Sequence, residues 1–299
     1  GVPPAGHRRI HEGVSVKTAD AIQGSSLRAM RIDPLAIGAL SATAVAAVGV
    51  LSFGSQVVLS LLAQAVIVSL LALGVGFLIR VSGLDSFGHA APFGLGAYGV
   101  AFALSRGAPL APELGLALIV PAVALVFFLI GLLVGRLGGI AFAMMTLAVG
   151  QAISVAATKF RTLTGGADGL QIELPERLFG LDASTIQQPA SMFVIGLAVL
   201  GCVYALLRIF ETSRWGRLAV AIRENEERVR FLGYRTRALR AAVYALSSAV
   251  ACAGGVLFGL YQGFVSPEIL HWTFSGSGLI MAILGGSASL WGPIAGAFV

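Results

Sequence analysis

Charged residues are scarce in this chain of 299 residues. Asp, Glu, Lys and Arg together make up only 11% of it, whereas 57% of the residues are hydrophobic. A water-soluble globule of this size needs more polar surface than such a composition supplies. The mean hydropathy of +0.90 agrees. The composition therefore predicts that the chain places its apolar surface in a lipid bilayer.

Cysteine is rare as well, and two of the four histidines, His89 and His271, stand alone in the sequence. Cys202 and Cys252 both lie within apolar runs, which excludes a disulfide framework, so we expect both to be packing residues. His89 and His271 have no partner at metal-ligand spacing. We therefore expect no metal site.

A phosphate-binding loop is also missing. Such a loop carries glycines before a Lys-Thr or Lys-Ser pair, but His11 and Val16 occupy those places before Lys17 and Thr18. No residues are spaced as a catalytic constellation either. We expect a non-catalytic membrane protein that binds no cofactor of its own.

Apolar runs near 20 residues long recur along the chain, which is the length that a spanning helix needs. These runs are apolar on every face, unlike the alternating strands of a membrane barrel. We predict an all-α integral membrane protein, a polytopic helical bundle of about eight spans. The predicted spans are residues 35–53, 57–79, 87–104, 114–134, 138–157, 192–209, 241–262 and 274–299.

The basic residues predict an orientation. Residues 1–33 are polar and lack the apolar core of a signal peptide, so we expect a cytoplasmic tail ahead of a transmembrane domain at 34–299. With that orientation, 16 of the 20 Lys and Arg residues lie inside. The four outside are Arg106, Lys159, Arg161 and Arg177. This bias follows the positive-inside rule, so the net charge of +6 does not call for nucleic acid.

The third predicted span is unusual because Pro92 and four glycines interrupt it. We expect a broken or re-entrant segment there. Irregular backbone at membrane depth lies against protein or a water-filled passage, which makes the segment a candidate solute path. Close packing of helices around small residues explains the pattern equally well. The path candidates are His89, Pro92, Gly94, Gly96 and Tyr98.

Two hydrophilic segments stand out, residues 159–190 outside and residues 211–240 inside. Within the inner one, the spacing predicts one amphipathic helix that Ser213 caps and Gly233 ends. Its apolar face consists of Trp215, Leu218, Ile222, Val229 and Leu232. Asn225 and Glu226 interrupt that face, which favours docking against another protein. A basic helix held on anionic lipid is the other interpretation.

Six blocks resemble, in order, the M-type permease subunits of branched-chain amino acid ABC importers. The resemblance covers the chain from about residue 84 to its end. The blocks are SFGHAAPFGLGAY at 86–98, FAMMTLA at 142–148, LTGGADGL at 163–170, AIRENE at 221–226 with Leu232-Gly233, FVSPE at 264–268 and LGGSASLWGP at 284–293.

The resemblance implies a bacterial inner-membrane importer with several subunits. Two permeases form the passage, two cytoplasmic ATPases use ATP and Mg, and an external binding protein delivers the solute. Family members carry branched-chain amino acids or other small polar or organic-acid solutes. Because Pro92 and Ala141 stand where the family leads us to expect aromatic residues, the solute is not inherited with the fold.

The resemblance also implies two contact regions. The family's ATPase-contacting motif is Glu-Ala-Ala-x-x-x-Gly, and residues 227–233 have its spacing, with Arg and Val in place of the alanines. The coupling candidates are Arg223, Glu224, Asn225, Glu226, Glu227, Arg228 and Gly233. Outside, the candidates for a rim that receives the binding protein are Thr164, Gly165, Gly166 and Asp168. A plain glycine-rich turn explains the same residues.

A stand-alone secondary transporter or channel is the alternative function. Secondary carriers usually place proton-relay or ion-coupling groups inside their spans, but the ionisable residues of this chain gather at the ends of the predicted spans. Their placement favours an external source of energy.

Overall fold

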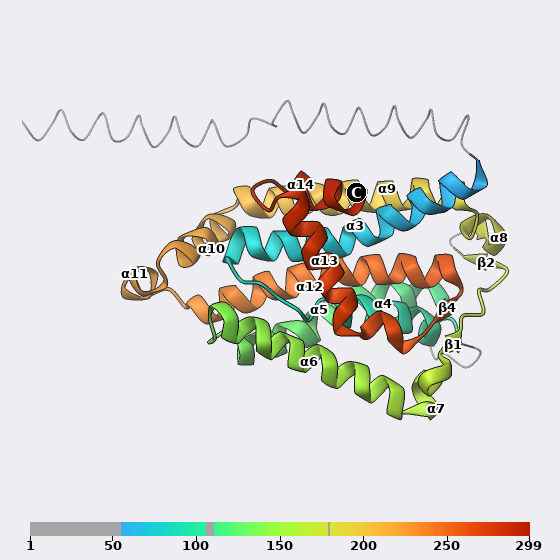
Figure 1. Cartoon of the computed structure of the whole chain (residues 1–299), viewed down its shortest axis with the longest axis horizontal. Coiled ribbons are helices and arrows are strands. Elements are labelled where there is room, and N and C mark those ends of the chain that lie inside the picture. Colours follow the sequence, from blue (N-terminus) through green and yellow to red (C-terminus); the bar gives the residue numbers. More distant parts are fainter. Residues whose placement is uncertain (1–54, 106–110, 179) are drawn as a thin grey trace, which may run out of the picture. The chain divides into compact units, whose positions relative to one another are not determined.

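The computed structural model describes residues 55–105, 111–178 and 180–299 (Figure 1). The tail at 1–33 and the predicted span at 35–53 lie outside these residues. In the described ranges, five helices are long and apolar enough to cross a membrane. They are α3 (Gln56–Ser82), α5 (Pro112–Val134), α6 (Gly139–Lys159), α9 (Pro189–Thr212) and α12 (Thr236–Gln262). Each coincides with a predicted span, so the all-α membrane architecture is confirmed.

Two further apolar helices, α4 (Ala90–Ala103) and α13 (Trp272–Gly285), have only 14 residues each. At 1.5 Å per residue such a helix is about 21 Å long, shorter than the roughly 30 Å hydrocarbon core. Neither crosses a bilayer alone. Pro92 lies in the first turn of α4, where proline is tolerated, so it does not break the helix. The irregular backbone covers residues 83–89, ahead of α4, and only residues 87–89 of it belong to the predicted third span.

The prediction of one continuous last span at 274–299 is wrong. The helix α13 ends at Gly285, and a second helix, α14 (Trp291–Ala297), packs against it. Glycines permit this fold, because a side chain at Gly296 would collide with the carbonyl oxygen of Met281 and one at Gly285 with that of Gly292. The turn itself contains Gly286 with φ 88°, a left-handed conformation that favours glycine.

The centre of the protein is the antiparallel pair α3 and α12, which are the most buried of the five long helices. Helix α12 also packs along α4 and α5. Its small residues allow a close approach: a side chain at Gly255 would collide with the carbonyl oxygen of Phe93, and one at Gly96 with that of Cys252. In Figure 1, α9 and α6 lie on opposite sides of this centre.

One end of the helices, here called the basic end, carries α10 (Arg214–Glu224) and α11 (Glu226–Phe231), which project beyond the spans (Figure 1). Glu211 ties this end together, because Arg80 Nε lies 2.7 Å from one of its carboxylate oxygens and Arg208 lies 3.4 Å from the other. Arg223 donates a 2.6 Å hydrogen bond to the Arg80 carbonyl. The helix α10 is thereby held against the end of α3.

The opposite end, here called the β end, has short elements. They are α7 (Arg161–Thr164), η1 (Gly166–Asp168), β1 (Leu170–Gln171), β2 (Arg177–Leu178), β3 (Leu181–Asp182), α8 (Ala183–Ile186), β4 (Phe264–Val265) and η2 (Pro267–Leu270). Strand β1 pairs antiparallel with β4, with Leu170 opposite Val265, and β2 pairs with β3. The β1–β4 pair joins two loops that are almost 100 residues apart in the sequence.

Candidate functional site

A buried polar cluster surrounds His89, which is completely inaccessible. Its Nδ1 lies 3.0 Å from the Ser86 hydroxyl, and its Nε2 lies 2.5 Å from the Ser247 hydroxyl in α12. Ser247 donates its own hydrogen to the Gly74 carbonyl of α3, at 2.9 Å. Because that hydrogen is engaged, the Nε2–H of His89 donates to Ser247 and Nδ1 accepts from Ser86.

The first turn of α4 begins inside the protein and needs partners for its backbone. The Ala90 N–H donates a 2.6 Å hydrogen bond to the hydroxyl of Ser275, in the first turns of α13. The Gly88 N–H is 3.3 Å from the Ser86 hydroxyl. In a bilayer, backbone groups that leave a helix must be satisfied internally. Side chains of α12 and α13 therefore fix the place where α4 starts.

The path candidates lie together on α4 and just before it, but mostly in helix contacts. Gly94 faces Leu270 and Gly96 faces Cys252 so closely that a side chain at either glycine would collide. Close packing therefore accounts for both glycines, and their part in a solute path stays a prediction. Pro92 is buried. Tyr98 lines a groove of about 450 Å³ between α4 and α5, whose walls are otherwise mainly apolar.

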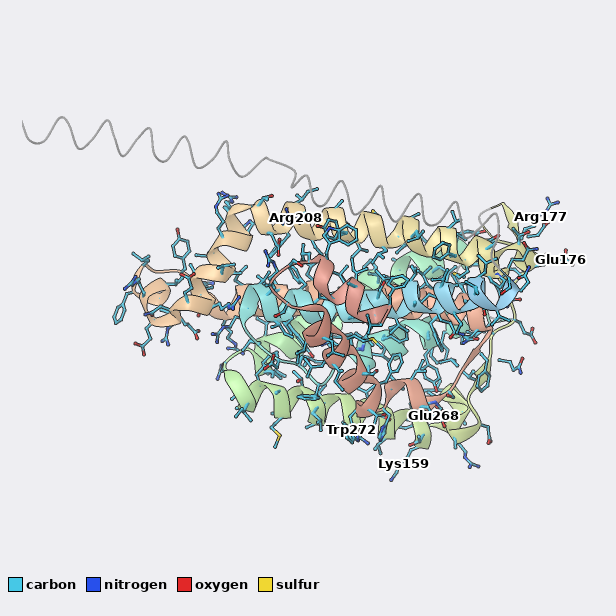
Figure 2. All side chains as sticks on the ribbon, turned by 45° about the horizontal axis from the view of Figure 1, so that its top comes forward. Lys159, Glu176, Arg177, Arg208, Glu268 and Trp272 are labelled. Carbon is cyan, nitrogen blue, oxygen red and sulfur yellow. The ribbon has the colours of Figure 1, made fainter. Side chains whose placement is uncertain are left out.

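A polar pocket of about 470 Å³ lies at the β end, here called the β-end pocket. Its lining residues come from α6, η1, η2 and the start of α13: Ser154, Thr158, Ala167, Pro267, Glu268, His271 and Thr273. Figure 2 shows Glu268 close to the start of α13 at Trp272. Within the described ranges Glu268 makes no ion pair, whereas His271 Nδ1 lies 3.0 Å from the Thr273 hydroxyl. The pocket thus combines a free carboxylate with several hydroxyl groups.

The rim candidates lie next to this pocket. The Thr164 hydroxyl bonds inward, to the carbonyl oxygens of Ala157 at 2.5 Å and Phe160 at 2.8 Å. Gly165 and Gly166 have φ values of 73° and 65°. These features are those of a glycine-requiring turn. Asp168 is exposed, and contact with a binding protein at these residues stays a prediction.

The single amphipathic helix predicted for residues 213–233 is wrong in one respect: the segment forms two helices. Ser213 caps α10 as expected, by accepting a 3.2 Å bond from the Gly216 N–H. Asn225 is extended, with φ −158° and ψ 95°, and accepts a 2.9 Å bond from the Arg228 N–H. Asn225 therefore ends one helix and caps the next. Gly233, with φ 87°, follows the end of α11.

The break changes which side chains face the protein. Ile222 and Val229 are buried as the apolar stripe predicts, but Trp215 and Leu232 are exposed. Val229 belongs to α11, so the direction in which its side chain points does not follow from the helical periodicity of α10. The stripe is therefore only partly correct.

Of the coupling candidates, Glu226 is engaged within the chain. It lies 2.8 Å from the Thr236 hydroxyl and 2.8 Å from Arg240, both in α12. Arg223 holds α10 to α3. The other charged candidates, Glu224, Glu227 and Arg228, are exposed. Contact with another protein at these residues stays a prediction.

An exposed apolar tip follows the charged turns of α11, although Leu232 was predicted to lie on the face that packs against protein. Phe231 is 90% exposed, Leu232 70% and Tyr234 52%. These three large side chains form an exposed apolar patch beside charged helices, a feature that is unusual for a solvated surface. In the sequence, the sign of this tip is that Phe231 and Leu232 follow directly after the mainly charged residues 227–230. Two large apolar residues are unusual at the end of a solvated helix.

Cys202 is exposed, contrary to the packing role expected for it, whereas Cys252 is buried. In the part of the chain that the structure describes, no three His, Cys, Asp or Glu residues lie close enough to hold a metal ion.

Five long apolar helices, two short ones that meet inside the protein and a projecting pair of polar helices define a multi-pass membrane permease. The chain belongs to a particular family of such proteins, the permease component of the branched-chain amino acid transport system, whose family model matches residues 57–299.

Two relatives are high-affinity branched-chain amino acid transport system permease proteins LivM. The protein of Salmonella typhimurium is 32% identical over 300 residues, covering 92% of this chain and 67% of that protein. The Escherichia coli protein is 32% identical over 256 residues, and the chain spans only 59% of its length. The autoinducer 2 import system permease protein LsrC of Yersinia pestis is 27% identical over 83% of this chain. No solved structure gives a significant match.

The hydrogen bonds around His89 predict a stability effect. Replacing Ser247 by Ala leaves the His89 Nε2–H and the Gly74 carbonyl without their partner, so we expect the free energy of unfolding to fall by about 1–3 kcal/mol. Thermal unfolding of the purified protein in detergent measures it. Ser60→Ala is the matched control, because Ser60 bonds only to its own helix. Equal midpoints for both variants would contradict the stabilising role of the cluster.

Proposed function

We propose that the chain is a non-catalytic membrane subunit of an ATP-driven importer for branched-chain amino acids or a related small polar solute. It forms the passage with a second permease, receives solute from an external binding protein and couples to two cytoplasmic ATPases. ATP and Mg bind in those ATPases. The membrane is a bacterial inner membrane with the N-terminus in the cytoplasm.

The distribution of charge supports this orientation. Of the 14 Lys and Arg residues in the described ranges, only Lys159, Arg161 and Arg177 lie at the β end, and the other 11 lie at the basic end. Positive residues favour the cytoplasmic side. The basic end is then inside and the β end outside.

The projecting helices are the observation that carries the proposal. A charged helix pair that extends beyond the membrane spans and ends in exposed Phe231 and Leu232 suits a groove on a second protein (Figure 1). The helix α11 is fixed to α12 through Glu226 and Arg240, and the helix α10 is fixed to α3 through Arg223. A force on the tip of this pair would therefore reach the helices at the centre of the protein.

The β-end pocket supports an amino acid as the solute. A free α-amino acid carries an ammonium, which suits the Glu268 carboxylate, and a carboxylate, which suits the Thr273 hydroxyl. The Thr158 hydroxyl donates its hydrogen to the Val155 carbonyl, so it can accept from the ammonium. The pocket volume of about 470 Å³ is ample for a molecule the size of leucine. On the proposed orientation, the pocket faces the side from which the binding protein delivers.

The alternative function, a secondary transporter, would be favoured by an ionisable residue within the membrane, because such residues often relay protons. The buried His89 is a candidate for that role. Both of its ring nitrogens are engaged by serines, which supports a structural role instead.

The apolar tip at Phe231, Leu232 and Tyr234, which we call the coupling surface because we propose that it contacts the ATPase, is tested with Phe231→Asp. A carboxylate at this position opposes insertion into an apolar groove, so we expect at least a tenfold loss of ATPase subunits that copurify with the permease, and a similar loss of leucine uptake in liposomes. Phe160→Asp is the matched control, because Phe160 is 60% exposed at the β end. Normal copurification and uptake by the Phe231 variant would contradict the coupling role.

The proposed binding of solute in the β-end pocket is tested with Glu268→Gln. The amide keeps the size of the side chain but removes the charge that an ammonium requires, so we expect the KM for leucine uptake to rise about tenfold, equivalent to about 1.4 kcal/mol. Glu176→Gln changes an exposed carboxylate elsewhere at the β end and leaves KM unaltered (Figure 2). An unaltered KM in the Glu268 variant would remove this pocket from the solute path.

A further inference from the structure

A second polar pocket lies at the basic end, with a volume of about 620 Å³. It is formed where α5 ends, between the turn that follows α5, the helix α11 and the start of α12. The lining residues are Leu132, Gly135, Arg136, Glu226, Arg230, Tyr234, Arg235, Thr236, Arg237 and Ala238. We refer to it as the arginine pocket.

The arginine pocket has a large excess of positive charge. Four of its residues are arginines, whereas its one acidic lining residue, Glu226, is already paired with Arg240 at 2.8 Å. The guanidinium groups of Arg136, Arg230 and Arg235 form no hydrogen bond or ion pair with another described residue. Three cationic side chains that line one pocket without a partner among the described residues attract an anion.

The arginine pocket also lies at the boundary of the membrane. Arg237 donates a hydrogen bond from Nε to the carbonyl oxygen of Leu132, in the last turn of the spanning helix α5. On the same turns of α5, Leu129 is 55% exposed and Leu133 73% exposed. The first turn of α6 adds Ile140 at 82% exposed. Charged and apolar surfaces are therefore continuous at this place.

We propose that the arginine pocket binds the headgroup of an anionic phospholipid, whose acyl chains lie along α5 beside Leu129 and Leu133. Guanidinium groups bind phosphate through paired N–H donors, and basic pockets at the cytoplasmic ends of spans suit acidic headgroups. Free inorganic phosphate shares the headgroup chemistry, but the exposed leucines give it nothing to contact. The site does not depend on which solute the protein carries.

The ATPase is a less fitting occupant. The exposed tip at Phe231 and Leu232 projects beyond the spans, whereas the arginine pocket includes the last turn of the spanning helix α5. A cytoplasmic protein meets the tip first, and a lipid headgroup lies at the level of the pocket.

Native mass spectrometry of the full chain in detergent tests the proposal, with dioleoyl phosphatidylglycerol, dioleoyl phosphatidylcholine and inorganic phosphate as separate probes. We expect phosphatidylglycerol to bind at least tenfold more tightly than phosphatidylcholine. The double variant Arg230→Gln, Arg235→Gln should lose that preference at least tenfold, and Arg136→Gln should weaken it alone. The control Arg214→Gln, Arg217→Gln removes the same charge from α10, outside the pocket, and should keep the preference.

Three results would overturn the proposal. The first is that the double variant binds phosphatidylglycerol as tightly as the wild-type protein. For this comparison both proteins must elute as one species and have the same unfolding midpoint, which shows that the variant is folded. The second is phosphate that binds as tightly as the lipid, which would assign a free anion to the pocket. The third is a double variant that keeps phosphatidylglycerol but no longer copurifies with the ATPases, which would place the arginines in the ATPase interface.

Discussion

The hydrogen bond from the Ala90 N–H to the Ser275 hydroxyl joins the two short helices where each begins. Residues 86–89 are non-helical, and Ser86, Gly88 and His89 among them are buried, where the surrounding lipid and apolar side chains supply no water. Their polar groups must therefore be satisfied by other elements. His89 meets this need through Ser247 of α12, which in turn bonds to α3. The position of α4, and with it the groove to α5, depends on these few contacts.

The helix α13, which fixes the start of α4, also connects the interior of the protein to the basic end and to the β end. Helix α13 starts next to α4 and continues to a sharp turn at Gly285 and Gly286, and the loop that follows reaches the basic end, where Arg80 donates to the Ala288 carbonyl. At the other end, the approach to α13 through β4 and η2 forms one wall of the β-end pocket. A movement of α13 would thus change the β-end pocket and the contacts of Arg80 together.

The sequence predicted the long spans because length and uniform hydrophobicity are sufficient to place a helix in lipid. Hydrophobicity alone gave the wrong prediction at residues 274–299, since two helices that fold back on each other are as apolar as one continuous helix. The contacts of Gly285 with Gly292 and of Gly296 with Met281, and the left-handed Gly286, distinguish the two arrangements. The break at Asn225 was predictable in part, because asparagine is a strong helix cap. The partner of His89 was not, because Ser247 is 158 residues away in the chain. Likewise, the two motif blocks at 163–170 and 264–268 were visible separately, and their pairing depends on the fold.

Sidedness is the central claim, because the coupling surface, the β-end pocket and the arginine pocket have their proposed roles only if the basic end faces the cytoplasm. Cysteine labelling of intact cells measures it directly, in a Cys202→Ser background that removes the exposed native thiol. An impermeant maleimide added outside should label Asp168→Cys and spare Asn225→Cys until the membrane is opened. Labelling of Asn225→Cys in intact cells, with Asp168→Cys protected, would contradict the account.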